Sequence, residues 1–478
     1  MVNRLSARDS MFYFLDDTSS TTHLGSLLIV SPGPKSSGAS GARRTLDYPA
    51  LVSLVENRLQ LVPRYRQVVR EVTFGLARPV WSDDPDFDIN FHIRRAGLPK
   101  PGGAEQLHDL VARVMSRPLD RTRALWEMYL IEGLPDGQLA ILTKSHRCLV
   151  DGHASREISE VICDSVVSVE KLPEDLWMPK SPPGAAALAV GALAEALSRP
   201  TELVESLVSG NSVVGGLRHA AGSTIDRIGT TIRQLVDSAP SSPFDTASTS
   251  TRIFTTASVP RRGCAKIADR NGCTVNDVEL AIISGVMRRW LLSVQEFMPS
   301  DDTVRVVLPL SARESGVERT PEDNTRWITV DRPGFVTDLP VGEDNPKVQL
   351  AQVAGLANRY AQSSRRVTMG PSPLLPDLGV VPFPELSSRA FNNLGGRAFN
   401  VPISMAITPV ATRYLAGFTV SDLHVVPTLM SGRALAISVV DYGDKLQFAF
   451  IADRGVVSDL PAMADYVTEA FDELLATK

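Results

Sequence analysis

The sequence predicts a mixed α/β protein with two domains. Short β-rich runs alternate with amphipathic helical patterns on both sides of a middle segment of different composition. The chain has 478 residues, of which 43% are hydrophobic, so it is too long for a single core. Residues 181–250 are rich in Ala, Gly, Ser, Pro and Val. We therefore expect an N-terminal domain at 1–180, a crossover linker at 181–250 and a C-terminal domain at 251–478.

In the N-terminal domain, the expected elements lead to one polar segment. In chain order they are a strand at Leu24–Val30, helices at Tyr48–Leu61 and Gln106–Val114, and strands at Trp126–Leu134 and Gln138–Thr143. The turn Pro135-Asp136-Gly137 separates the last two strands. The polar segment Lys144–Gly152 is expected to follow the second strand directly and to end in a turn at its Asp-Gly pair.

The crossover and the C-terminal domain contain further amphipathic segments. In the crossover, helices are expected at Ala186–Ser198 and Ser223–Val236, followed by a loop up to residue 251. The elements expected after it are a strong helix at Asn276–Leu292, strands at Thr303–Leu310 and Trp327–Val330, a helix at Pro346–Gln362, a hairpin of Ala434–Val440 with Leu446–Ile451, and a last helix.

Charge and cysteine content exclude several classes of function. Lys and Arg total 49 against 54 Asp and Glu, and the net charge of -5 contains no basic stripe that would suit a nucleic acid. The four cysteines show no CxxC spacing and no paired histidines nearby, so neither a metal site nor a disulfide framework is expected. No Gly-rich phosphate loop is present. We expect no nucleic acid, no metal and no resident cofactor.

The apolar segments predict a cytoplasmic protein. The first residues contain no apolar core of a signal peptide, and the longest uncharged stretches are too short to cross a bilayer. The Ala-rich helix expected at Ala186–Ser198 could lie on a membrane or lipid-droplet surface, although an ordinary packed helix is the commoner explanation.

The segment Lys144–Gly152, with the sequence KSHRCLVDG, carries the candidate chemistry. A histidine at the end of a strand can take a proton from an alcohol, and a nearby carboxylate can orient the ring or hold its loop. The simpler interpretation is a structural loop in which Asp151 forms a salt bridge or caps the next helix. From the residues alone, this structural interpretation is the commoner one.

The same segment resembles the HHxxxDG motif of the wax ester synthase/diacylglycerol acyltransferase family, itself a version of the HxxxDG motif of coenzyme A-dependent acyltransferases. His146, Asp151 and Gly152 match the first His, the Asp and the Gly of that motif. In the family the second His is the catalytic base, and Arg147 occupies its position.

Further motifs extend the resemblance over nearly the whole chain. They are Leu5–Phe12 (similar to LSPxDxxF), Arg78–Trp81 with Asp84–Asp88 (RPxW and DPxFD), Arg117–Arg121 with Leu125–Glu127 (RPLDR and LWE, with Ala124 in place of proline), Val275–Val278 (the ND motif), Leu339–Asp344 and Ala452–Arg454. A second departure from the family is Met405, in the stretch Ser404–Pro409 that we align with SNVPGP.

The resemblance implies two chloramphenicol acetyltransferase-like domains with an active-site tunnel at their interface. Long-chain acyl-coenzyme A would be a co-substrate, and diacylglycerol or a fatty alcohol would accept the acyl group. Asp151 would support the loop. Asn276 and Asp277 would face the channel, where Asn276 could hold the acyl carbonyl; N-capping of their helix is an equally good interpretation.

Arg147 leaves two functions open. Arginine cannot act as a general base at neutral pH, because its pKa exceeds ~12 and it has no acceptor lone pair. His146 is expected to point to the opposite face, and His153 is more simply exposed or packed. The chain is therefore expected to be a weakened acyltransferase or, alternatively, a non-catalytic lipid or acyl-coenzyme A binding protein. Arg147 could also be an introduced change, against which Met405 argues mildly.

Overall fold

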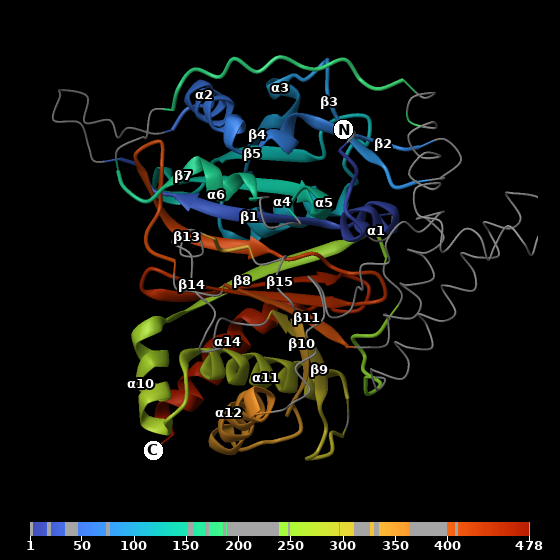
Figure 1. The fold of residues 1–478 in the computed structure, drawn as a ribbon. Helices are drawn as coiled ribbons and strands as arrows, with labels where there is room; N and C mark the ends of the chain where they lie inside the picture. Colours follow the sequence, from blue (N-terminus) through green and yellow to red (C-terminus); the bar gives the residue numbers. More distant parts are fainter. Residues whose placement is uncertain are drawn as a thin grey trace, which may run out of the picture.

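The computed structural model describes residues 3–16, 21–33, 46–72, 77–150, 156–167, 172–184, 188, 239–246, 249–295, 297–309, 326–328, 334–362, 399–406 and 410–477. These residues form a mixed α/β structure with two large sheets (Figure 1). Among them, no helix is long and apolar enough to cross a membrane. The helices expected at Ala186–Ser198 and Ser223–Val236 lie outside the described residues, apart from Leu188.

The first sheet has seven strands, two of which come from the C-terminal part of the chain. Its order is β4 (Ile93–Gly97), β5 (Trp126–Glu132), β6 (Leu139–His146), β1 (His23–Val30), β13 (Phe418–Val426), β12 (Tyr414–Leu415) and β7 (Cys163–Asp164). Only the pair of β4 and β5 is parallel. The predicted division at 180/251 stays a prediction, but β12 and β13 show that the sheets do not follow it strictly.

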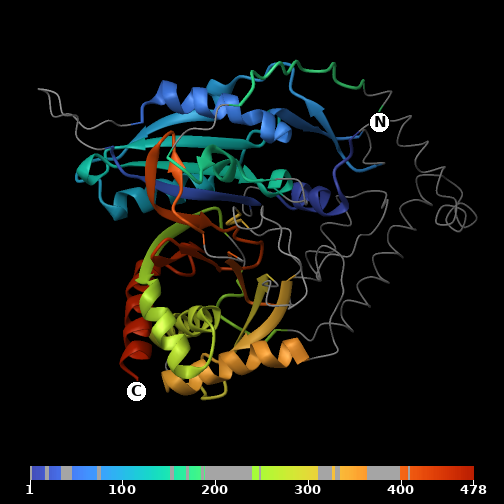
Figure 2. The same ribbon diagram turned by 60° about the vertical axis from the view of Figure 1, so that its left-hand side comes forward.

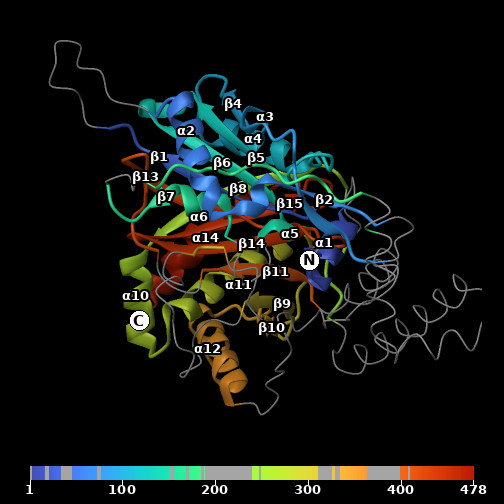
Figure 3. The ribbon, with the colours of Figure 1, turned by 45° about the horizontal axis from the view of Figure 1, so that its top comes forward.

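Helices and a small sheet pack around the first sheet, with α4 on the side that faces the second sheet. They are α1 (Ala7–Leu15), α2 (Tyr48–Arg58), η1 (Leu59–Leu61), η2 (Pro63–Arg66), β2 (Gln67–Arg70), β3 (Val80–Asp83), α3 (Ile89–His92), α4 (Ala104–Ser116), η4 (Pro135–Gly137), α5 (Arg147–Val150) and α6 (Ile158–Ile162). The turn η4 has positive φ at Asp136 and Gly137, which explains its Asp-Gly pair. Figure 3 shows α1 and α5 side by side near the N-terminus.

The second sheet has six strands and carries helices on one face. Its order is β10 (Gly334–Leu339), β9 (Val304–Pro309), β11 (Val401–Met405), β14 (Leu435–Tyr442), β15 (Lys445–Asp453) and β8 (Arg252–Pro260). Its helices are α10 (Arg261–Asn271), α11 (Val275–Val294), α12 (Pro346–Gln362) and α14 (Leu460–Ala476), and Figure 2 shows them on the side away from the first sheet.

The two sheets meet through a buried apolar layer. This layer combines Leu27 and Leu142 of the first sheet with Phe254, Ala436 and Ile451 of the second. Helix α4 lies at its edge, where the Arg252 backbone N–H donates to Ser116 Oγ at 3.2 Å. Each sheet also has its own core on its other face, so the two-domain architecture expected from the sequence is confirmed.

Most of the predicted elements are confirmed, and two predictions were wrong in detail. Strand β6 does not stop at Thr143 but continues to His146, because Ser145 pairs with both Leu24 and Trp126. Of the strand expected at Trp327–Val330, Trp327 and Ile328 are not in a strand, and residues 329–330 lie outside the described residues. The backbone N–H groups of Trp327 and Ile328 instead donate to the Glu160 carboxylate, at 2.7 and 2.9 Å, which replaces the partners that a sheet would provide.

We predict that Gly25→Ala strongly destabilises the fold. A methyl group at position 25 would lie 1.9 Å from the Thr143 carbonyl oxygen, so β1 and β6 would have to separate. The expected loss is at least ~3 kcal/mol of unfolding free energy, measured by urea denaturation. The matched control is Gly97→Ala in β4, where a methyl group meets nothing within 4 Å. Equal stability of the two variants would contradict the prediction.

Candidate functional site

The pairing of β1 with β6 positions the motif residues His146 and Arg147. His146 is the last residue of β6 and lies directly opposite His23, while Arg147 begins α5. The backbone N–H of His146 donates to Leu125 O, and that of Arg147 donates to Thr22 O, both at 2.9 Å. The two motif residues are thus held from opposite sides by the residues that directly precede β5 and β1.

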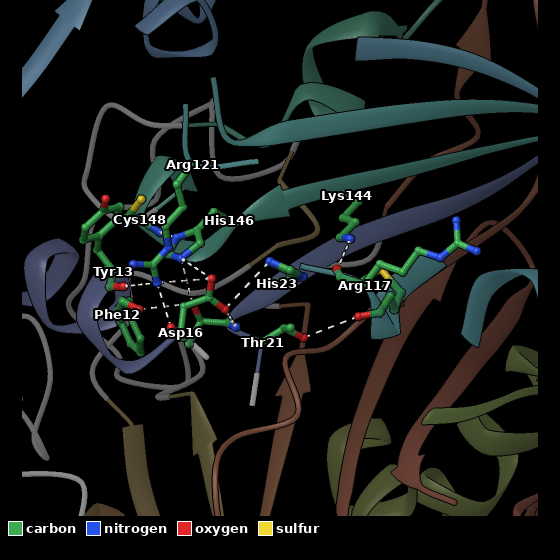
Figure 4. A network of polar contacts seen from close by, with 12 residues as sticks. Phe12, Tyr13, Asp16, Thr21, His23, Arg117, Arg121, Lys144, His146 and Cys148 are labelled. Atoms are coloured by element: carbon green, nitrogen blue, oxygen red, sulfur yellow. Dashed lines mark hydrogen bonds and ion pairs between the residues drawn. The ribbon is translucent and has the colours of Figure 1, made fainter. Parts of the chain in front are cut away.

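Both ring nitrogens of His146 are engaged within the protein. Nδ1 accepts a hydrogen bond from the Cys148 backbone N–H at 3.1 Å, which requires the neutral ring to carry its proton on Nε2. Nε2 then donates to Thr22 Oγ1 at 2.9 Å, and this hydroxyl donates to Phe12 O at 3.2 Å (Figure 4). Burial lowers the pKa of His146 to about 3, and the charge of Arg121 adds to the effect. With this hydrogen bonding, the His146 ring has no free lone pair with which it could act as a base.

The Arg147 side chain packs against helix α1. Its guanidinium carbon lies 4.1 Å from the centroid of the Phe12 ring, a cation–π distance. Ser6 caps α1 by accepting from the Asp9 backbone N–H at 3.0 Å. The opening motif Leu5–Phe12 therefore serves to place an aromatic ring against position 147.

A second buried cluster centres on Asp16, just after α1. Its Oδ1 accepts from the Thr22 backbone N–H at 2.8 Å, and its Oδ2 lies 3.6 Å from Arg121 Nη2. The same Arg121 nitrogen donates to the Asp16 and Tyr13 carbonyls at 2.7 and 2.9 Å. Asp16 lies between two histidines, with Oδ1 3.9 Å from His23 Nε2 and Oδ2 3.7 Å from His146 Nε2.

Lys144 lies two residues before His146 and has a structural role. Its Nζ donates to the Val114 carbonyl at 2.9 Å and to the Arg117 carbonyl. These groups terminate helix α4, whose last carbonyls lack partners within the helix. Burial lowers the pKa of Lys144 to about 8, so the side chain remains largely charged at neutral pH.

A buried polar network lies on the opposite face of β6. Ser145 Oγ donates to Glu157 Oε1 at 3.0 Å and is 3.1 Å from the Tyr65 hydroxyl. Ser26 Oγ accepts from Ser159 Oγ and from Trp327 Nε1, at 2.9 and 3.1 Å. Together with the bonds from Glu160 to residues 327 and 328, this network ties α6 to a segment of the C-terminal half.

Asp151 and Gly152, the matches to the Asp and Gly of the motif, lie outside the described residues, as does His153. Their roles stay predictions. Met405 is the last residue of β11, where it pairs with Val439 and is buried in the core of the second domain.

Asn276 and Asp277 lie in the first turn of α11, which begins at Val275, and neither of them is the N-cap. Thr274 is the N-cap, and its side chain accepts from the Asp277 backbone N–H at 3.4 Å. Asp277 in turn accepts from the Thr274 backbone N–H at 2.8 Å, completing a capping box. Asn276 lies inside the first turn and is half-buried. Capping thus occupies Asp277, while a channel role for Asn276 stays a prediction.

Sequence reasoning missed three residues of the cluster next to His146: Asp16, Thr22 and His23. Each lies before or at the start of the apolar run that predicts β1. The signal was weak, because their relation to His146 follows only from the register of β1 against β6. Within the described residues, no group of three or more His, Cys, Asp or Glu side chains is arranged to hold a metal ion.

Comparison with protein families gives two matches. Residues 5–279 match the wax ester synthase/diacylglycerol acyltransferase catalytic domain, and residues 334–475 match the C-terminal domain of the same family. A probable diacylglycerol O-acyltransferase of Mycobacterium tuberculosis, tgs3, is 44% identical over 265 residues, covering 54% of this chain and 92% of the relative. A second one, tgs1, is 28% identical over 486 residues, covering 99% and 96%.

Solved structures show the same fold. The wax ester synthase/diacylglycerol acyltransferase from Marinobacter aquaeolei VT8 superposes with a TM-score of 0.67 at 22% identity, covering 99% of this chain and 98% of that one. The first condensation domain of the CDA synthetase superposes with a TM-score of 0.55 at 14% identity, covering 100% and 97%.

We predict that Glu160→Gln stabilises the protein at alkaline pH. Burial raises the pKa of Glu160 to about 7, so the charged form is disfavoured in the folded state. Its cost is absent below the unfolded pKa of ~4.3 and is complete above pH 7. Glutamine keeps the oxygen that accepts from residues 327 and 328. Unfolding free energy should rise by roughly 2–4 kcal/mol at pH 8, and most of this gain should vanish at pH 5.

The control for this measurement is Glu132→Gln, which removes a partly exposed ion pair with Arg95 and should change stability by less than ~1 kcal/mol at either pH. A Glu160→Gln variant that is equally destabilised at pH 5 and pH 8 would show that the buried carboxylate is required as an anion.

Proposed function

Because the chain belongs to the wax ester synthase/diacylglycerol acyltransferase family, we propose that it transfers a long-chain acyl group from acyl-coenzyme A to a lipid hydroxyl. The observation that carries this proposal is the match of the catalytic-domain model over residues 5–279. The names of the relatives tgs3 and tgs1 favour diacylglycerol over a fatty alcohol as the acceptor. Acyl-coenzyme A is then a co-substrate, and the reaction needs no resident cofactor.

The reaction moves one proton and exchanges two bonds. The acceptor hydroxyl loses its proton while its oxygen forms a bond to the thioester carbonyl carbon. The carbon–sulfur bond then breaks, and coenzyme A leaves as the thiol. Arg147 cannot take the proton, but a guanidinium close to the carbonyl can donate hydrogen bonds to the developing oxyanion. Loss of a positioned base typically costs ~10²- to 10⁴-fold in rate, so we propose a slow enzyme.

The water-insoluble acceptor also suggests where the protein works. We propose a cytoplasmic protein that touches a membrane or lipid droplet peripherally, because diacylglycerol resides there. Cys163 and Cys264 are buried as free thiols, which is compatible with a reducing compartment. The amphipathic helix expected at Ala186–Ser198 is the candidate contact.

We predict that Arg147→His accelerates acyl transfer. A histidine at this position restores the residue type of the family motif, and we expect at least a ten-fold increase in turnover. Release of coenzyme A from a long-chain acyl-coenzyme A is measured with and without diacylglycerol or hexadecanol, and the ester is detected directly. The control is Arg95→His, an exposed arginine of β4 paired with Glu132, which should leave the rate unchanged.

Two results would argue against this function. Silence of both the parent and the Arg147→His variant with either acceptor would favour the non-catalytic binding role, which bound acyl-coenzyme A in an equilibrium assay would then support. A parent that is faster than the variant would show that Arg147 is the better residue for this chain.

A further inference from the structure

The ring nitrogens of the buried His23 have no hydrogen-bond partner in the part of the chain that the structure describes. The exposed fraction of His23 is only 2%, and neither Nδ1 nor Nε2 makes a hydrogen bond to any described residue. Leaving a buried polar atom without a partner costs ~1–3 kcal/mol, so such atoms call for an explanation. His146 provides the contrast, because both of its nitrogens have partners 2.9 to 3.1 Å away.

The sheet register places His23 beside the position where the family keeps its base. His23 pairs with His146, and the preceding residue, Thr22, accepts the Arg147 backbone N–H. Strand alternation puts His23 and Leu27 on one face of β1, and Leu27 belongs to the apolar layer between the two sheets. The His23 ring therefore points to the side on which the two domains meet, 6.0 Å from the His146 ring.

Asp16 is placed to orient the His23 ring. Its Oδ1 is 3.9 Å from His23 Nε2, and the carboxylate is fixed by the Thr22 backbone N–H and by Arg121 (Figure 4). A proton on Nε2 would face this carboxylate and leave the Nδ1 lone pair available. Burial, reinforced by the charge of Lys144, holds the pKa of His23 well below 6.5, so the ring is neutral at pH 7.

We propose that His23 accepts the proton of the acceptor alcohol, in place of the histidine that Arg147 replaces, and that Asp16 is its positioning residue. This inference rests on the proposed function. The proton passes from the hydroxyl to His23 Nδ1 as the oxygen bonds to the thioester carbon. When the carbon–sulfur bond breaks, the same proton passes to the departing sulfur. Among the neighbouring groups, His146 has no free lone pair, and Lys144 donates to two carbonyls.

The test compares one substitution in two backgrounds. His23→Asn is made in the parent and in Arg147→His, and coenzyme A release and ester formation are measured for all four proteins. In the parent we expect a loss of at least ~100-fold, because the base is removed. In Arg147→His, which has its own base at the family position, we expect a loss of less than about three-fold.

The matched control is His424→Asn. His424 is a buried histidine of β13 that pairs with Leu27 of β1, so it lies in the same sheet and faces the same layer. Its replacement should have the same effect in both backgrounds. Circular dichroism and thermal melting establish that each variant is folded. If His23→Asn does not fold, His23→Gln and the pH profile of the parent provide the test.

The pH profile follows from the state of the ring. For the parent, kcat/KM should stay level from pH 8 to pH 6 and fall only below that, since His23 is protonated well below pH 6.5. A fall that begins above pH 7 overturns the proposal.

In the comparison of the two backgrounds, an equal loss of activity from His23→Asn in both shows a structural role and also overturns the proposal. If the parent is silent while Arg147→His is active, the family function holds and the role of His23 is rejected. Silence of all four proteins rejects both.

Discussion

The close approach of β1 and β6 is the constraint on which the candidate site depends. At Gly25 the two backbones come so near that no side chain fits between them. This contact fixes the register that sets His23 against His146 and Arg147 against Thr22. A shift by one residue would turn every side chain of β1 to the other face, and the cluster around Asp16 could not form.

Much of the fold could be predicted from the sequence because the hydrophobic periodicity is clear. The helical spacing in α11 and the apolar run of β1 are long enough to identify the elements. The failure at Trp327 has a different cause. Its apolar neighbours look like a strand, but the tertiary structure offers a buried carboxylate, Glu160, which takes the two N–H groups.

The candidate site could be predicted only in part. The motif positions His146 and Arg147 follow from local sequence, and both lie where the chain leaves β6. The hydrogen bonding of the His146 ring cannot be predicted from local sequence, because its partner Thr22 is distant in sequence. The same applies to His23, whose sequence neighbours are ordinary strand residues. Its two ring nitrogens lack hydrogen-bond partners among the described residues, and only the three-dimensional arrangement reveals this.

Because β12 and β13 come late in the sequence, the first sheet is incomplete during most of the synthesis of the chain. The edge of β1 that β13 covers stays unpaired until about 250 residues beyond β7 have been synthesised, which takes about 12–50 s at elongation rates of roughly 5–20 residues per second. During that time the nascent N-terminal sheet offers an apolar, hydrogen-bonding edge to other chains. The yield of folded protein in a cell therefore depends on chaperone capacity and on the speed of translation through the crossover. A measurement of the stability of the finished fold gives no information on either quantity.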